Sequence, residues 1–262
     1  MITVQRYVKA QSLEEAYRLN QNKKNRILGG MMWTRLGRGS IQTAIDLCDL
    51  GLDKIEENEN EFSIGATVTL RMLEQHAGLN AYTDGAVKAA VKDIVGVQFR
   101  NMATVGGSIW GRFGFSDVLT LFLAMDTYVE LYGGGVIPLE EFAKMPYDRD
   151  LLIRLIVKKT PLRIVYTSMR NQRTDFPVIA CAVSLTNCEY RGVIGARPSK
   201  AMILRDESAL LDGGITEESA RAFAEYVAQK TPTSPNVRAG AEYRTHLIEV
   251  LTFRAIKQLG GI

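Results

Sequence analysis

The chain has 262 residues, 46% of them hydrophobic, which is enough to bury a core in one large domain or in two to three small ones. Lys and Arg outnumber Asp and Glu by 32 to 29, an excess too small to indicate binding to nucleic acid or to an anionic membrane. The N-terminus lacks a signal-peptide pattern and no run approaches the roughly 18 apolar residues that span a bilayer, so we expect a cytoplasmic protein.

In chain order, the first predicted element is a helix that opens at the capping box Ser12-Leu-Glu-Glu15. Strands are predicted at 26–28 and 41–47, and the charged stretch 56–61 predicts a turn and a subdomain boundary. The elements predicted next are a strand at 62–68 and a helix at 70–75 that Thr69 caps. Two further helices are predicted at 84–96, capped by Asp84, and at 116–125, capped by Ser116-Asp117. Strands are predicted at 128–132 and 151–157, on either side of Gly133-Gly-Gly135.

Pro161 breaks the pattern after Lys158-Lys-Thr160 and predicts a second boundary. Three strand-like runs follow at 164–168, 178–186 and 190–196, and then two helices at about 216–229 and 239–258. Strands followed by helices are typical of an α+β fold. We therefore expect an α+β chain with a domain at 1–160, divided into subdomains of about 1–57 and 58–160, and a C-terminal domain at 161–262.

Two glycine pairs are the most informative features of the sequence. Gly29-Gly30 follows the strand-like Ile27-Leu28, and Gly106-Gly107 follows a short polar approach. Because glycine has no Cβ, its backbone N–H can line a concave anion site at little steric cost. Two separated glycine loops suit a diphosphate held from both sides, although a lone Gly-Gly pair is more often a structural turn.

These loops resemble those of the FAD-binding medium subunits of molybdenum hydroxylases, the family of xanthine dehydrogenase and carbon monoxide dehydrogenase. The family's first loop commonly reads Ala-Gly-Gly-Thr-Asp, where this chain has Leu28-Gly-Gly-Met-Met32. The second commonly reads Arg-Asn-x-Ala-Thr-Ile-Gly-Gly-Asn, where this chain has Arg100-Asn-Met-Ala-Thr-Val-Gly-Gly-Ser108. A Ser-Asp pair falls on Ser116 and Asp117, and the segment 238–247 resembles the family's Arg-Ala-Ser-x-Glu-Tyr-Arg-x-His-Leu.

The resemblance implies the two-subdomain FAD-binding fold of vanillyl-alcohol oxidase and the peptidoglycan-precursor reductase, with FAD in the cleft between the subdomains and a C-terminal α+β domain beside them. It also implies an electron-transfer role. A large partner subunit would carry molybdopterin and hydroxylate the substrate, a small partner subunit would carry 2Fe-2S clusters, and the FAD would pass electrons to NAD or another acceptor. The chain itself would hold no metal and no catalytic residue.

The resemblance assigns cofactor contacts to both glycine loops and to several later positions. Asp117 would accept hydroxyl hydrogen bonds from the ribitol or ribose region, while Ile94 and Leu151 fit ordinary core positions equally well. The full predicted set is Ile27, Leu28, Gly29, Gly30, Met31, Met32, Trp33, Thr34, Ile94, Ala103, Thr104, Val105, Gly106, Gly107, Ser108, Ser116, Asp117, Leu151 and Arg170.

Two departures from the family pattern bear on function. Met31-Met32 replaces the polar pair of the first loop, which leaves the diphosphate to backbone N–H groups and Thr34. The lysine that approaches the flavin in the family is absent, with Thr167 or Ser168 in its place, and this predicts a lower flavin potential or a different acceptor. A self-contained FAD reductase or oxidase and a cofactor-free scaffold are the alternatives.

The remaining reactive side chains form no recognisable site. Cys48, Cys181 and Cys188 are widely spaced and indicate neither disulfides nor an iron–sulfur site, so we expect reduced thiols in or near the core. His76 and His246 have neither metal-ligand nor triad spacing and are expected on the surface or on a helix face.

Overall fold

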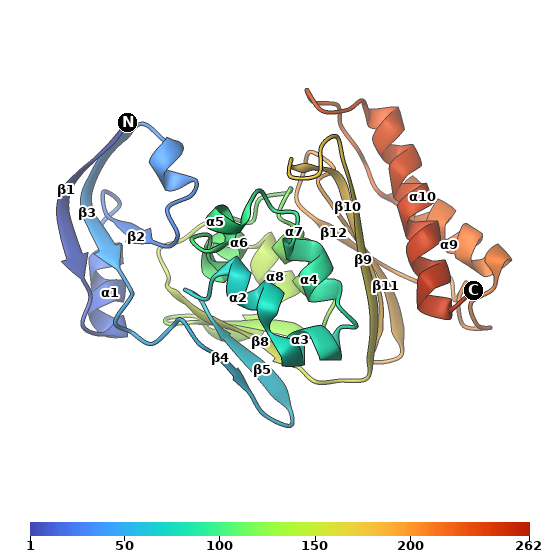
Figure 1. Cartoon of the computed structure of the whole chain (residues 1–262), viewed down its shortest axis with the longest axis horizontal. Coiled ribbons are helices and arrows are strands. Elements are labelled where there is room, and N and C mark those ends of the chain that lie inside the picture. The colour runs from blue at the N-terminus through green and yellow to red at the C-terminus, as the bar shows by residue number, and fades with distance from the viewer. The chain divides into compact units, whose positions relative to one another are not determined.

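The computed structural model describes residues 1–262 and divides into two compact units, each made of several segments of the chain (Figure 1). The first unit comprises Met1–Met72, Val97–Gly111 and Thr127–Val157. The second comprises Leu73–Gly96, Arg112–Asp126 and Lys158–Ile262. None of the helices has both the length and the apolar character that crossing a membrane requires.

The N-terminal sheet of the first unit is parallel, with strand order β1-β3-β2. Its elements are β1 (Ile2–Lys9), α1 (Leu13–Asn20), β2 (Arg26–Leu28), the 3-10 helix η1 (Thr34–Leu36) and β3 (Gly39–Asp46). The Ser12 side chain accepts a hydrogen bond from the Glu15 backbone N–H at 3.1 Å and caps α1, as the sequence predicts. Ala16 of α1 packs with Ile45 of β3 in a small buried core.

The second sheet of this unit has strand order β4-β5-β8-β6-β7. Its strands are β4 (Ile55–Glu57), β5 (Glu61–Gly65), β6 (Thr127–Leu131), β7 (Gly135–Pro138) and β8 (Leu152–Lys158). The helices that accompany it in the chain are α2 (Leu70–Gln75), α5 (Val97–Arg100), α6 (Val105–Trp110) and α8 (Leu139–Lys144). The Thr69 side chain accepts from the Met72 backbone N–H at 3.2 Å, so the predicted cap of the 70–75 helix is confirmed.

The second unit is built on an antiparallel sheet with strand order β12-β11-β10-β9. The strands are β9 (Leu162–Arg170), β10 (Pro177–Thr186), β11 (Glu189–Gly195) and β12 (Met202–Arg205). The helices are α3 (Ala77–Tyr82), α4 (Ala86–Val91), α7 (Asp117–Leu123), α9 (Glu217–Lys230) and α10 (Ala241–Gly260). Helices α9 and α10 lie on one face of the sheet, and α4 and α7 lie on the other (Figure 1).

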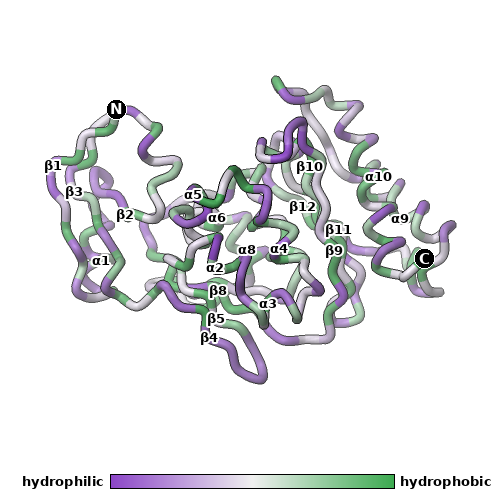
Figure 2. The backbone as a smooth tube through the Cα atoms, in the orientation of Figure 1, coloured by the Kyte–Doolittle hydropathy of each residue, from purple (hydrophilic) through white to green (hydrophobic).

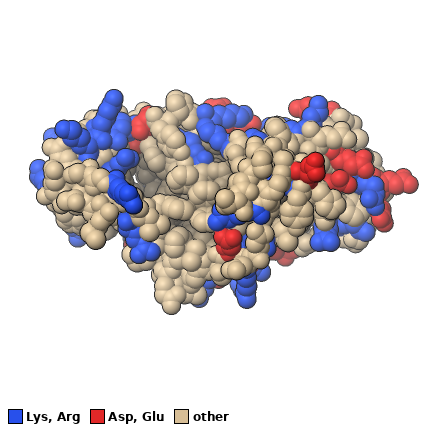
Figure 3. All heavy atoms as spheres, turned by 90° about the horizontal axis from the view of Figure 1, so that it is seen from above, with Lys and Arg blue, Asp and Glu red and all other residues tan.

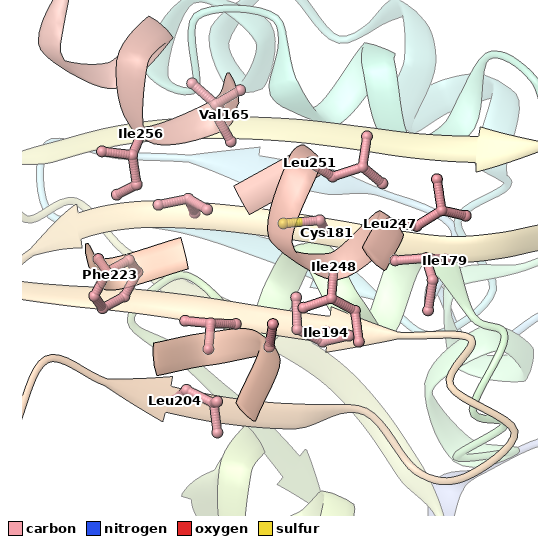
Figure 4. Packing of buried hydrophobic residues seen from close by; sticks show 14 of the residues in the cluster. Val165, Ile179, Cys181, Ile194, Leu204, Phe223, Leu247, Ile248, Leu251 and Ile256 are labelled. Carbon is pink, nitrogen blue, oxygen red and sulfur yellow. The ribbon is translucent and has the colours of Figure 1, made fainter. Parts of the chain in front are cut away.

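Strand β10 is buried along almost its whole length because helices cover both of its faces. On one face, Ile179 and Cys181 meet Leu247 and Ile248 of α10 (Figure 4). On the other face, the Ser184 hydroxyl donates to the carbonyl of Ala124 at the end of α7 at 2.5 Å. A strand buried on both faces has a nearly continuous apolar sequence, which is why this strand is readily predicted.

The predicted α+β fold is confirmed, but several local predictions are wrong. The turn predicted at 56–61 is present at 58–60, in the hydrophilic hairpin that joins β4 to β5 (Figure 2), but its flanking residues belong to these strands. The prediction missed β7, which begins at Gly135, and α8, which both precede β8. The helix predicted at 84–96 ends at Val91, and its N-cap is Gly85, not Asp84. Cys48 and Cys188 are exposed, whereas the prediction placed them in or near the core. The boundaries near residues 57 and 160 stay predictions.

Candidate functional site

The two glycine loops lie against each other within the first unit. A Cβ built on Gly30 would stand 1.7 Å from the Met102 carbonyl oxygen and 2.9 Å from the Ala103 Cα. A Cβ on Gly29 would stand 2.9 Å from the Thr104 Oγ1. The separations at Gly30 are too short for any side chain, so this position requires glycine because the backbone of the second loop rests on it, whereas Gly29 meets only the side-chain hydroxyl of Thr104. The structure therefore brings the two predicted loops together.

Thr104 organises the second loop as the N-cap of α6. Its Oγ1 accepts from the Gly107 N–H at 3.1 Å, and its carbonyl accepts from the Ser108 N–H at 3.1 Å. The Val105 and Gly106 N–H groups donate to the carbonyls of Val68 and Ala66, each at 2.8 Å. The N–H groups of residues 105–108 are therefore used inside the protein, contrary to the expectation that Gly106 and Gly107 direct theirs to an anion.

The reason for glycine at 106 is also packing. A Cβ on Gly106 would stand 2.6 Å from the Ala66 carbonyl oxygen, whereas one on Gly107 would meet only the Thr104 Oγ1, at 3.1 Å. Neither residue, nor either glycine of the first loop, has a positive φ. The second loop thus forms a rigid backbone surface against which the first loop packs.

The first loop carries the free donors. Among the hydrogen bonds of the chain, none is donated by the backbone N–H groups of Gly30, Met31 or Met32, and all three residues are only half-buried. Met31 has a left-handed φ of 60°, and its carbonyl accepts from the Arg35 N–H at 3.1 Å. Successive N–H groups around a left-handed residue form a concave anion site. Sequence reasoning missed this conformation because it is uncommon for Met.

The charged side chains in the stretch of chain that contains the first loop are all basic, although Asp46 of β3 pairs with Leu28 just before the loop. Residues 16–45 contain no Asp or Glu. Six exposed basic residues occupy the same stretch, namely Arg18, Lys23, Lys24, Arg26, Arg35 and Arg38. Figure 3 shows Lys and Arg side chains gathered over the N-terminal elements. Such a field raises the local concentration of an anionic ligand.

Asp117 belongs to a buried network in the second unit. It is the first residue of α7, and its N-cap is Ser116, whose hydroxyl accepts from the Leu119 N–H at 3.1 Å. The side chains of Asp117 and Arg170 are 5% and 8% exposed, and Arg170 Nη2 lies 2.6 Å from Asp117 Oδ1. The Tyr166 hydroxyl donates to the same oxygen. Burial raises the pKa of Asp117, while Arg170 and Tyr166 act in the opposite direction.

Leu151, Ile94 and His76 each have a local structural role. Leu151 is 2% exposed and its side chain belongs to the core around Ile45, so the core interpretation of this residue is the one the structure favours. Ile94 lies in the turn after α4, with its N–H bonded to the Val91 carbonyl at 3.0 Å. His76 is the N-cap of α3, where its Nδ1 accepts from the Leu79 N–H at 3.1 Å.

The comparisons with known proteins agree with this fold. Residues 3–160 match the family described as FAD binding domain in molybdopterin dehydrogenase. Residues 164–259 match the CO dehydrogenase flavoprotein C-terminal domain. Together they define an FAD-binding oxidoreductase subunit. The chain belongs to the molybdopterin dehydrogenase FAD-binding family, whose members are the flavin subunits of molybdenum hydroxylases of the xanthine and CO dehydrogenase type, as the glycine loops predict.

Full-length relatives show the same relationship. The chain is 25% identical to the uncharacterized protein YgfM of Escherichia coli K12, with 95% of this chain and 93% of that protein covered. It is 24% identical to the nicotine 6-hydroxylase medium subunit of Paenarthrobacter nicotinovorans, with 98% and 97% covered. In structure it resembles CO dehydrogenase from Hydrogenophaga pseudoflava, with a TM-score of 0.85, 22% identity and 96% of each chain covered.

Proposed function

We propose that this chain is the FAD-binding electron-transfer subunit of a cytoplasmic molybdenum hydroxylase. Its partners are a large subunit that carries molybdopterin and a small subunit that carries 2Fe-2S clusters, and electrons leave through NAD or another acceptor. The observation that carries the proposal is the set of free N–H groups at Gly30, Met31 and Met32, held against the second glycine loop. FAD, when bound, supplies the redox chemistry through its flavin ring.

The residues of the first loop fit a diphosphate without polar side chains at positions 31 and 32. Three backbone N–H groups can each donate one hydrogen bond to a phosphate oxygen, and hydrogen bonds to charged groups are stronger than those between neutral groups. Thr34 follows the loop and begins η1. The basic residues of the stretch 16–45 add a favourable field. The replacement of polar residues by Met31-Met32 is therefore compatible with FAD binding.

The flavin-proximal lysine of the family has one clear counterpart in position. Thr167 pairs with Cys181, which faces α10, while Ser168 pairs with Ala180 on the opposite face of the sheet. Because side chains alternate along a strand, Ser168 shares its face with Tyr166, whose hydroxyl bonds to Asp117, one of the predicted FAD contacts. We therefore place Ser168, and not Thr167, where relatives have the lysine. A neutral hydroxyl in place of an ammonium group favours a lower flavin potential than in lysine-containing relatives.

The decisive experiment is purification of the chain from its native host under conditions that preserve complexes. We expect flavin absorbance in the visible spectrum, co-purification of two further subunits, and substrate-dependent electron transfer only in their presence. Substrate turnover by the isolated chain would support a self-contained FAD reductase or oxidase instead. Protein that neither retains FAD nor takes it up on titration would support a cofactor-free scaffold and refute the proposal.

A further inference from the structure

Arg244 of α10 is almost fully buried, with 1% of its surface exposed. Its guanidinium group donates to the carbonyls of Val178 and Ala196, the latter at 2.6 Å, and to the Asn236 Oδ1, also at 2.6 Å. A buried charge requires such partners, because a charged group left without them in the protein interior is strongly destabilising. Arg244 thus fixes the loop before α10 to the sheet.

The loop held by Arg244 presents a second arginine. Asn236 Oδ1 also accepts from the Arg238 N–H at 2.9 Å, so one amide oxygen joins the two arginines. The Arg238 guanidinium lies over the Phe176 ring, 4.9 Å from its centroid, and its Nη2 is 3.2 Å from the Asp175 Oδ1. Arg238 and the Phe176 N–H together lower the pKa of Asp175, which keeps this carboxylate charged.

Asp175 connects this loop to the buried network at Asp117. Its backbone carbonyl accepts from Arg170 Nη1 at 2.6 Å, while Arg170 Nη2 bonds to Asp117 Oδ1 at 2.6 Å. The two ends of one planar guanidinium are therefore fixed by two different partners. A planar guanidinium group that is bonded at both ends has a single orientation, and in that orientation Arg170 Nη2 donates to Asp117.

We propose that Arg238 is a positioning residue that sets the orientation of Arg170 and, through it, of the Asp117 carboxylate. The inference rests on the proposed function and on the contact that the family resemblance implies for Asp117, which would accept hydrogen bonds from the ribitol or ribose hydroxyl groups of FAD. Without the Arg238 side chain, the Asp175 carboxylate loses its ion pair, and the turn at 171–176 keeps its backbone hydrogen bond from Asp175 to Gln172 and the bond from the Asn171 side chain to the Arg238 carbonyl. Arg170 is then fixed less tightly at its Nη1 end, and the orientation of Asp117 depends on Tyr166 and on Arg170 Nη2 alone.

This role differs from a purely structural one in a measurable way. A structural residue lowers FAD affinity whatever stands at position 117, whereas a positioning residue acts only while Asp117 is present. The variants that separate the two are Arg238→Ala, Asp117→Asn and their combination. Arg221 provides a matched control, because its guanidinium also lies 4.9 Å from a ring centroid, that of Phe253, and 3.6 Å from the carboxylate of Glu217.

The experiment is titration of each apoprotein with FAD, with thermal unfolding of the same samples to confirm that each variant is folded. We expect Arg238→Ala to weaken FAD binding roughly 3- to 10-fold in the wild-type background and less than about 2-fold in the Asp117→Asn background. Arg238→Lys, which retains a charge beside Asp175, should lose less than Arg238→Ala, and Arg221→Ala should leave the affinity unchanged in both backgrounds.

Equal weakening in both backgrounds, or none, overturns the inference while leaving the proposed function intact. Loss of affinity in Arg221→Ala as large as in Arg238→Ala also overturns it. A wild-type protein that does not bind FAD contradicts the proposed function itself, so the two failures are distinguishable.

Discussion

Gly30→Ala is expected to separate the two glycine loops. The added methyl carbon would lie 1.7 Å from the Met102 carbonyl oxygen, 2.5 Å from its carbonyl carbon and 2.9 Å from the Ala103 Cα. Ordinary contacts of this kind begin at 3.4 Å, so the loops must part by 3.4 − 1.7 = 1.7 Å along that direction. All three obstructing atoms are backbone, and no change of side-chain rotamer can relieve the clash.

The size of the effect follows from that displacement. An extra methyl group in a packed site costs about 1–3 kcal/mol, and a clash with backbone belongs at the upper end of that range. For a protein of this size about 3 kcal/mol lowers Tm by roughly 6–12 °C. The same shift moves the free N–H groups of Gly30, Met31 and Met32. Loss of one charge-assisted hydrogen bond, worth about 1.5–3 kcal/mol, weakens FAD binding at least about tenfold.

Gly107→Ala is the matched control. Its Cβ would approach only the Thr104 Oγ1, at 3.1 Å, and its N–H is already bonded to that same oxygen. The residue lies in α6, where Ala is preferred to Gly by roughly 0.5–1 kcal/mol. FAD titration and thermal unfolding of the apoproteins should therefore show a large loss for Gly30→Ala and little change for Gly107→Ala. Wild-type affinity and Tm in Gly30→Ala, or equal damage in the two variants, would refute the reasoning.

Three further outcomes are expected. Met31→Gly removes the strain of a left-handed φ of 60°, so it should stabilise the apoprotein by roughly 1 kcal/mol and retain FAD binding. A fall in both stability and FAD affinity would show that the Met31 side chain is needed. Asp117→Ala leaves the buried Arg170 without its carboxylate and should lower the free energy of unfolding of the apoprotein by about 3–5 kcal/mol. Tyr166→Phe removes one hydrogen bond and should lower it by about 1–3 kcal/mol. Thermal unfolding that gives the reverse order would contradict the network. Burial raises the pKa of the Cys181 thiol from 9.0 to about 12, so the stability that the neutral thiol contributes is complete below pH 9.0 and is lost as the pH rises toward 12. In denaturant unfolding at alkaline pH, Cys181→Ala should therefore lose less stability with rising pH than the wild-type protein does. An unchanged dependence of stability on pH would disprove the assignment.

Elements with a strong local signal could be predicted from the sequence. The capping hydroxyls of Ser12 and Thr69 lie where their spacing places them, and the apolar run of β10 is buried on both faces. Strand β1 gave no signal because most of its side chains are exposed, and an exposed strand has no apolar alternation. The start of α4 was misplaced by one residue because Asp84 itself has a left-handed φ of 47° and Gly85 is the cap.

The association of the two glycine loops could also be predicted, but not the reason for their glycines. A glycine pair shows that backbone approaches closely, and the sequence does not say which backbone. At Gly30 it is the carbonyl of Met102, and at Gly106 it is the carbonyl of Ala66. Both contacts join residues far apart in the chain, so only the folded structure reveals them. The assignment of individual residues to FAD stays a prediction, which the titrations above would test.

The two loops have different physical tasks, and this explains why positions 31 and 32 tolerate methionine. The second loop uses its N–H groups internally and its rigidity comes from Thr104, so it depends on the identity of its residues. The first loop offers N–H groups that any residue other than proline supplies. What it requires is glycine at position 30 for the close contact, and it has a left-handed residue at position 31. Because backbone groups and not side chains form this donor set, replacement of the family's polar pair is compatible with the proposed anion site.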